Sequence, residues 1–148
     1  MEAFANSDIG KVRDMNQDSY YISDKDDKIK LYIVADGMGG YKGGEIASKL
    51  AIESSKNYII NNFDQIKKER DQIIELIKNA IEYANMVVYE KSKEVPELAG
   101  MGTTIDVCLI YSNRIYIGHI GDSRVYRLRK GFFRKLTVIF AIKLLPHS

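Results

Sequence analysis

Residues 29–40 read IKLYIVADGMGG, an apolar run that is followed by an aspartate and a glycine-rich turn. The first seven of these residues, 29–35, are rich in Ile, Val and Tyr, which predicts a β-strand. A similar run covers residues 18–24, and the polar residues 25–28 separate the two runs. The pattern therefore predicts a β-hairpin whose second strand ends at Asp36.

Two helices are expected after the glycine-rich residues 37–44. In the first, apolar or small residues recur at helical spacing at positions 46, 47, 50, 51, 54 and 58. In the second, Asp64 is a candidate N-cap and Pro96 marks the end. The apolar face of this second helix consists of Ile66, Ile73, Ile77, Ala80, Ile81, Ala84 and Val88. Both faces are expected to pack into a core.

Strand patterns return after the helices, at residues 103–111, 115–120, 125–128 and 132–136. The connections between these runs are short, and short connections require antiparallel neighbours. The order of strands, two helices and a strand meander predicts an α+β fold with helices packed on an antiparallel sheet. We found no internal repeat and no linker, so residues 1–148 are expected to form a single domain.

The composition is that of an ordinary globular protein: 45% of the 148 residues are hydrophobic and 28% are charged. The single cysteine, Cys108, excludes an intramolecular disulfide. With no apolar leader at the start of the sequence, this predicts a reducing, cytoplasmic location. The apolar residues 138–145 are too few to cross a membrane, which takes about 20 residues.

The charges are unevenly distributed. Residues 1–122 hold 15 of the 22 basic residues and all 20 acidic ones, so residues 123–148 hold seven basic residues and no carboxylate. A basic segment can bind nucleic acid, but these arginines alternate with apolar residues as in a strand. We therefore expect no nucleic-acid partner.

Three carboxylates are placed where predicted strands begin or end. Asp18 begins one strand, Asp36 ends the next, and Asp122 follows residues 115–120. Strand ends can bring carboxylates together at one edge of the fold, where they suit a hard cation such as Mg²⁺ or Mn²⁺. A glycine after Asp36 lets a backbone carbonyl turn toward the ion. Each aspartate could also be a cap or a turn residue. Their occurrence together with Arg13 favours a site.

Four motifs give the sequence a specific resemblance to a known family. They are Ser7-Asp8-x-Gly10-x-x-Arg13-x-x-Asn16-Gln17-Asp18, Asp36-Gly37-Met38-Gly39-Gly40, Gly102-Thr103-Thr104 and Gly121-Asp122-Ser123-Arg124. The order and spacing of these motifs over residues 4–137 are similar to those of the type 2C metal-dependent (PPM) protein serine/threonine phosphatases in their bacterial form. The resemblance implies an antiparallel β-sandwich flanked by helices, and metal-dependent hydrolysis of phosphoserine and phosphothreonine in proteins.

The resemblance also implies roles for individual residues. Asp36 would bridge two Mn²⁺ or Mg²⁺ ions, the Gly37 carbonyl would complete one shell, and Asp18 would act through a metal-bound water. Asp122 matches a ligand of a third, looser ion, and Arg13 would bind the substrate phosphate. Partners would be phosphorylated proteins, including a Ser/Thr kinase. A metal pair activates water without a covalent enzyme intermediate, so Cys108 is expected in the core rather than as a nucleophile.

The sequence departs from the family at two places. Animal members carry a candidate acid, histidine, where this chain has Met38, so a metal-bound water would supply the proton, and His119 is interpreted as a sheet residue. After Thr137 the family continues with further metal aspartates, whereas residues 138–148 contain no carboxylate. We interpret them as an aberrant tail after a frameshift or premature stop, which makes the chain the N-terminal part of a phosphatase domain.

This departure leaves three readings of the function. The chain could be a phosphatase that binds metal weakly. It could be an inactive fragment whose open sheet edges bind other proteins, dimerise or aggregate. It could also be a regulatory relative that senses a partner.

Overall fold

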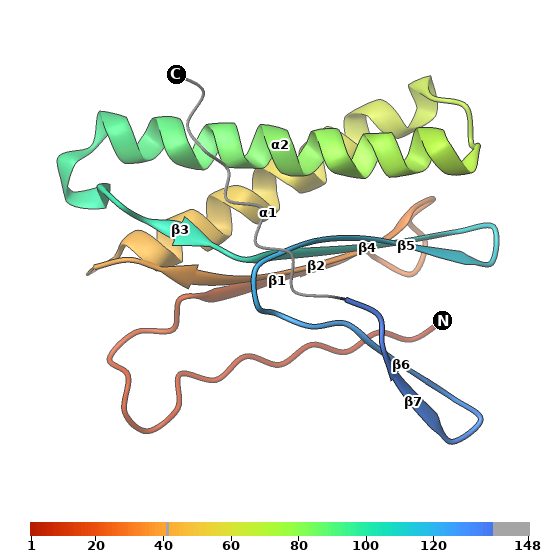
Figure 1. Cartoon of the computed structure of the whole chain (residues 1–148), viewed down its shortest axis with the longest axis horizontal. Helices are drawn as coiled ribbons and strands as arrows, with labels where there is room; N and C mark the ends of the chain where they lie inside the picture. Colours follow the sequence, from red (N-terminus) through yellow and green to blue (C-terminus); the bar gives the residue numbers. More distant parts are fainter. Residues whose placement is uncertain (41, 138–148) are drawn as a thin grey trace.

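The computed structural model describes residues 1–40 and 42–137, so the tail expected at 138–148 lies outside the described residues. Two long helices lie across one face of an antiparallel sheet, and a separate β-ribbon lies on the other side (Figure 1). The sheet has the strand order β1 (Asp18–Ile22), β2 (Lys30–Met38), β4 (Ile105–Tyr111), β5 (Arg114–Ile120). The short strand β3 (Gly102–Thr103) pairs with the end of β2. The predicted α+β class with antiparallel sheets is confirmed.

The predicted hairpin forms from β1 and β2, but β2 is longer than expected. The sequence placed Asp36 at the end of the strand, whereas β2 continues through Asp36 and Gly37 to Met38. The reason is that β3 supplies a partner: Gly37 lies opposite Thr103 and Met38 lies opposite Gly102. A strand boundary read from local composition misses a partner that arrives from a distant segment.

The strands predicted after the helices form antiparallel hairpins, but they do not make one meander. β4 pairs with β5, whereas β6 (Tyr126–Arg129) and β7 (Phe132–Lys135) form a separate two-stranded ribbon, in which β6 does not pair with β5. Both hairpin turns in this part of the chain use positive φ angles at their central residues. Ser112 and Asn113 have φ of 50° and 61°, and Lys130 and Gly131 have φ of 50° and 80°. Turns of this kind match the twist of the flanking strands, which explains why connections of two residues suffice.

Helix α1 (Gly43–Asn62) buries a face that is shifted from the predicted one. Its buried residues are Gly43, Gly44, Ala47, Ser48, Ala51, Ile52, Ser55 and Ile59, while Ile46, Leu50 and Tyr58 are only partly buried. The prediction missed Ser48 and Ser55, which gave no apolar signal, and instead included Ser54 as a small residue, which is only partly buried. Both hydroxyls donate to carbonyls of their own helix, that of Ser48 to Glu45 at 3.1 Å and that of Ser55 to Ala51 at 2.6 Å. The Ser48 hydroxyl also lies 3.0 Å from the Ser19 hydroxyl of β1. A hydroxyl with a local acceptor can be buried at little cost.

Helix α2 (Arg70–Glu94) buries the predicted face and ends two residues before Pro96. The predicted N-cap, Asp64, is wrong. It lies in a short 3-10 helix, Phe63–Gln65, and forms an exposed ion pair with Lys28. The chain turns again before α2 begins, so the helical pattern that includes Ile66 starts too early. A second 3-10 helix, Pro96–Leu98, leads into β3.

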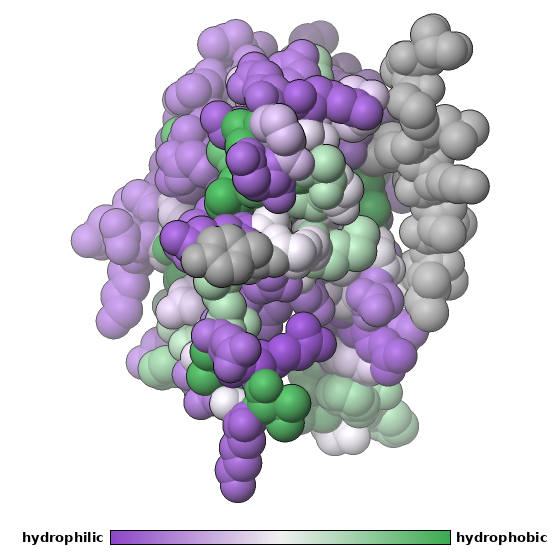
Figure 2. Space-filling model, turned by 90° about the vertical axis from the view of Figure 1, so that its left-hand side faces the viewer, coloured by the Kyte–Doolittle hydropathy of each residue, from purple (hydrophilic) through white to green (hydrophobic). Residues whose placement is uncertain are grey.

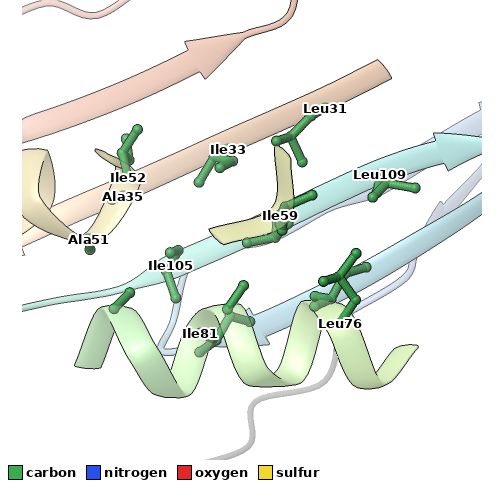
Figure 3. Packing of buried hydrophobic residues seen from close by; sticks show 14 of the residues in the cluster. Leu31, Ile33, Ala35, Ala51, Ile52, Ile59, Leu76, Ile81, Ile105 and Leu109 are labelled. Carbon is green, nitrogen blue, oxygen red and sulfur yellow. The ribbon is translucent and has the colours of Figure 1, made fainter. Parts of the chain in front are cut away.

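The core fills the space between the two helices and the sheet (Figure 3). Leu31 and Ile33 of β2 and Leu109 of β4 face Ile59 of α1. At Gly118 of β5, an added Cβ would lie 2.5 Å and 2.6 Å from side-chain carbons of Ile77 and Ile81, so α2 approaches this strand closely. Cys108 is half-buried in β4, and burial raises the pKa of its thiol. A thiol with a raised pKa is a poor nucleophile, in agreement with a structural role.

His119 lies in β5, as expected of a sheet residue, and it has a buried partner across the sheet. Its Nδ1 is 2.5 Å from Oδ1 of Asp106, the residue opposite it on β4, and the two side chains are 8% and 2% exposed. The second polar atoms, His119 Nε2 and Asp106 Oδ2, are buried without a hydrogen-bond partner among the described residues. Burial raises the pKa of Asp106, and the hydrogen bond from His119 opposes this rise.

We therefore expect His119→Leu to lower the free energy of unfolding by about 1–3 kcal/mol at neutral pH, because it leaves a buried carboxylate without a partner. Protonation of Asp106 favours the folded state, since its folded pKa lies above its ordinary value. The loss should thus be smaller at pH 5 than at pH 8 in urea unfolding experiments. The double variant Asp106→Leu/His119→Leu should recover most of the stability. An equal loss at both pH values would contradict this assignment.

Candidate metal and phosphate site

The first two carboxylates meet because of the register of the β1–β2 hairpin. Asp18 lies directly opposite Asp36 in this antiparallel pair. Residues opposite one another in such a pair project to the same face of the sheet. The hairpin therefore places the two carboxylates side by side, at the end of the sheet where β2 leaves it.

The backbone of Asp36 is held by Thr104, a residue that the sequence analysis assigned only to a motif. The Asp36 amide donates to the Thr104 hydroxyl at 2.9 Å, and the Asp36 carbonyl accepts from the Thr104 amide at 2.9 Å. The Thr104 hydroxyl also lies 2.8 Å from the hydroxyl of Ser123. These contacts bring the turn that carries Asp122 to the end of β2.

Gln17 is a second residue whose role the sequence analysis missed. Its carbonyl accepts a hydrogen bond from the Gly37 amide at 3.1 Å, and its side-chain amide donates to the Gly39 carbonyl at 3.1 Å. The Gln17 side chain also packs against Gly44, where an added Cβ would lie 2.7 Å from it. The clue to Gln17 in the sequence was its position between Asn16 and Asp18 in a motif. Its contacts, however, join segments far apart in the chain, and a pattern of neighbouring residues does not reveal such contacts.

The charges confirm which groups lie together. The pKa of Asp36 is raised, first by partial burial, next by the charge of Asp18 and a hydrogen bond with it, and then by the charge of Asp122; the charge of Arg13 lowers it. The structure thus brings the other three predicted side chains, Arg13, Asp18 and Asp122, within electrostatic reach of Asp36. Asp8, from the same opening motif, instead accepts a bond from the Gly10 amide at 2.6 Å and shapes the loop.

The oxygen atoms at this site are the kind of ligand that a hard divalent cation prefers, but they are too few to fill its coordination shell. The charges of Asp18 and Asp122 raise the pKa of Asp36, and a bound cation would offset this repulsion. Carboxylate and carbonyl oxygens are the ligands that Mg²⁺ and Mn²⁺ prefer. Among residues 1–40 and 42–137, however, no three His, Cys, Asp or Glu side chains converge closely enough to hold a metal ion on their own. Hard cations take about six oxygen ligands, so water or further groups must complete a shell.

The surroundings of the site are polar. Figure 2 views the end of the molecule where β2 and β3 meet the start of α1, and hydrophilic side chains predominate on this face. Met38, which replaces a candidate acid, is 66% exposed here. In the described part of the chain, no helix is long and apolar enough to span a membrane.

The comparisons with known proteins point to one family. A family model described as protein phosphatase 2C matches residues 11–138. The chain is 37% identical over 133 residues to the serine/threonine protein phosphatase PstP of Mycobacterium tuberculosis, which covers 90% of this chain and 24% of that protein. It is 30% identical over 137 residues to the serine/threonine phosphatase stp of Listeria innocua, covering 93% of this chain and 54% of the relative.

A solved structure shows the same similarity in three dimensions. The catalytic domain of PstP in complex with two manganese ions superposes with a TM-score of 0.73 at 36% identity, covering 89% of this chain and 53% of that one. The chain thus spans about half of this domain and of the Listeria relative.

Proposed function

Because the chain belongs to the protein phosphatase 2C family, we propose that it forms the N-terminal part of a metal-dependent domain that hydrolyses phosphoserine and phosphothreonine in proteins. The observation that supports this most strongly is the convergence of Arg13, Asp18 and Asp122 on Asp36, which combines a cation-binding group with a phosphate-binding one.

In this proposal each residue has a separate task. Asp36 would hold two Mn²⁺ or Mg²⁺ ions, the Gly37 carbonyl would supply one further ligand, and Asp18 would act through a water. Asp122 would help to hold a third ion. When bound, a pair of such ions lowers the pKa of a water and neutralises charge on the phosphate. Arg13 binds the phosphate with its planar, always charged guanidinium, which also orients the phosphorus for attack.

The scarcity of metal donors favours a second candidate. Since no three metal-binding side chains of the described residues converge closely enough to hold an ion, the chain alone would bind cations too weakly for turnover. It would then act as a binding or regulatory module. We further propose phosphorylated proteins, including a Ser/Thr kinase, as partners, and a cytoplasmic location, for which the single cysteine is the support.

A metal titration combined with an activity assay tests these alternatives. We expect the 148-residue chain to bind Mn²⁺ in calorimetry and to hydrolyse a small aryl phosphate only in its presence. Arg13→Ala should abolish most of this turnover, by about 100-fold, through the loss of a phosphate contact in the transition state, while Mn²⁺ binding stays unchanged. Arg70→Ala, on the exposed start of α2, is the matched control.

The outcomes separate the candidates. Mn²⁺ binding by a folded sample without any turnover would favour the binding module. A folded sample that does not bind Mn²⁺ would contradict the proposed metal site, and equal losses in Arg13→Ala and Arg70→Ala would contradict the role of Arg13.

A further inference from the structure

The ribbon formed by β6 and β7 carries an unusual concentration of positive charge. We call residues 124–135 the basic hairpin; its cationic residues are Arg124, Arg127, Arg129, Lys130, Arg134 and Lys135. Every residue of β6 and β7 is exposed, and residues 123–137 contain no Asp or Glu. None of the ion pairs found among the described residues uses one of these cations. Asp122 lies near enough to act on the charge of Arg124, but the other five cations of the basic hairpin form no ion pair within the described part of the chain.

The register concentrates arginines on one face of the basic hairpin. Arg127 lies directly opposite Arg134, and Arg129 projects to the same face. Like charges in such positions repel one another, so the arrangement lowers stability unless an anion lies between them. The other face carries one cation, Lys135, beside the apolar or aromatic residues Tyr126, Leu128 and Phe133. The rings of Tyr126 and Phe133 stack with centroids 4.7 Å apart.

The basic hairpin is joined to the candidate site by a series of hydrogen bonds. At its base, the Leu136 amide donates to the Val125 carbonyl at 2.8 Å and the Val125 amide donates to the Thr137 hydroxyl at 3.1 Å. Two residues earlier, the Ser123 hydroxyl contacts Thr104, which binds the backbone of Asp36. The basic hairpin lies on the side of the sheet away from the helices, as does the N-terminal segment (Figure 1).

We propose that the basic hairpin binds acidic residues that flank the phosphorylated residue of a protein substrate. This inference rests on the proposed function, since it assumes that a phosphorylated residue is bound beside Arg13. A substrate polypeptide that binds with its phosphate at the site would place the carboxylates of its flanking residues along the face of the basic hairpin that carries Arg127, Arg129 and Arg134. The attraction would also accelerate the encounter of an acidic substrate with the site.

Charge also favours an acidic peptide over nucleic acid as the ligand. A nucleic acid carries a phosphate at every nucleotide, so a strand that extended from the basic hairpin would bring several phosphates beside Asp18, Asp36 and Asp122, whereas the peptide brings a single one. Tyr126 and Phe133 stack on each other, which leaves each ring one fewer face for bases.

Fluorescence anisotropy in chelator-containing buffer tests the proposal without turnover. The probes are two labelled phosphoserine peptides of equal length, one flanked by Glu and the other by Gln. The wild-type chain should bind the Glu-flanked peptide about 10-fold more tightly at low salt, as three exposed charge contacts would contribute. This preference should disappear in Arg127→Gln/Arg129→Gln/Arg134→Gln. It should remain in the matched control Lys67→Gln/Arg70→Gln/Lys78→Gln, which removes the same charge from exposed positions in and before α2, on the opposite side of the sheet.

Several results would overturn the proposal. They are equal binding of the two peptides, an equal loss of preference in both triple variants, and tighter binding of a single-stranded oligonucleotide of the same net charge. Self-association of the wild type that the hairpin variant abolishes would assign the basic hairpin to a contact between copies. If the hairpin variant does not fold, the wild type still decides: its preference must fall as ionic strength rises. Failure of the proposed function would instead appear as absence of turnover with the Glu preference intact.

Discussion

Asp36→Asn is expected to weaken Mn²⁺ binding by the chain while making the metal-free protein more stable. Changing a residue that only hydrogen-bonds a metal ligand weakens metal binding by roughly 10- to 100-fold. Asp36 is itself the proposed bridging ligand, so we expect at least this loss of Mn²⁺ affinity. The gain in stability follows from its neighbours: partial burial, Asp18 and Asp122 all raise the pKa of Asp36. A carboxylate whose folded pKa is raised destabilises the charged folded state, and asparagine removes that charge.

Calorimetric titration with Mn²⁺ and thermal melts in chelator-containing buffer measure the two effects. Asp26→Asn is the matched control, since Asp26 is an exposed aspartate in the turn between β1 and β2. It should change neither quantity. Unaltered Mn²⁺ affinity in Asp36→Asn would remove Asp36 from the metal site, and a lower melting temperature would show that the repulsion among the three carboxylates is not the dominant effect.

Gly37→Ala is expected to be the most destabilising Gly→Ala substitution among the described glycines. A Cβ at this position would lie 1.9 Å from the carbonyl oxygen of Gly44 and 2.7 Å from that of Gln17. Both obstacles are backbone atoms, which cannot rotate away as a side chain does. To accommodate the methyl group, α1 must separate from β2, at a cost of about 3 kcal/mol or more.

Gly40→Ala is the matched control for this prediction, since nothing lies within 4 Å of a Cβ built there. Urea unfolding followed by circular dichroism should show a change within about 0.5 kcal/mol for Gly40→Ala. Similar unfolding free energies for the two variants would mean that the contact between Gly37 and Gly44 is easily relaxed.

The strands could be predicted from the sequence because alternation and turn residues are local. The turn at residues 25–28 even fixes the register that sets Asp18 opposite Asp36. The buried face of α1 could not be predicted in the same way. Ser48 and Ser55 count as polar in any pattern, and only their hydrogen bonds, one of them to a distant strand, make them suitable for the core.

The residues of the candidate site also divide into those that the sequence could predict and those that it could not. Asp18, Asp36 and Asp122 stand at strand ends in the sequence, and the resemblance to a known family supplies their proposed roles. Gln17 and Thr104 support them through contacts between segments far apart in the chain. Backbone amides and hydroxyls that meet only after folding leave no periodic pattern, so their part in the site emerges from the structure alone.

The strand order has a consequence for how the chain folds. The pairs β1–β2 and β4–β5 are local hairpins, but β2 and β4 pair only after both helices have been traversed. Local hairpins form within about 1–10 μs, whereas joining distant strands requires closing a long loop and is slow. Asp36 and Thr104 meet at this junction. Asp18 and Asp36 already meet in the local β1–β2 hairpin, but Asp122 reaches them only through this junction. We therefore expect the complete carboxylate cluster to form in a late, long-range step of folding, and a divalent cation that needs all three carboxylates to bind the native chain rather than the separate hairpins.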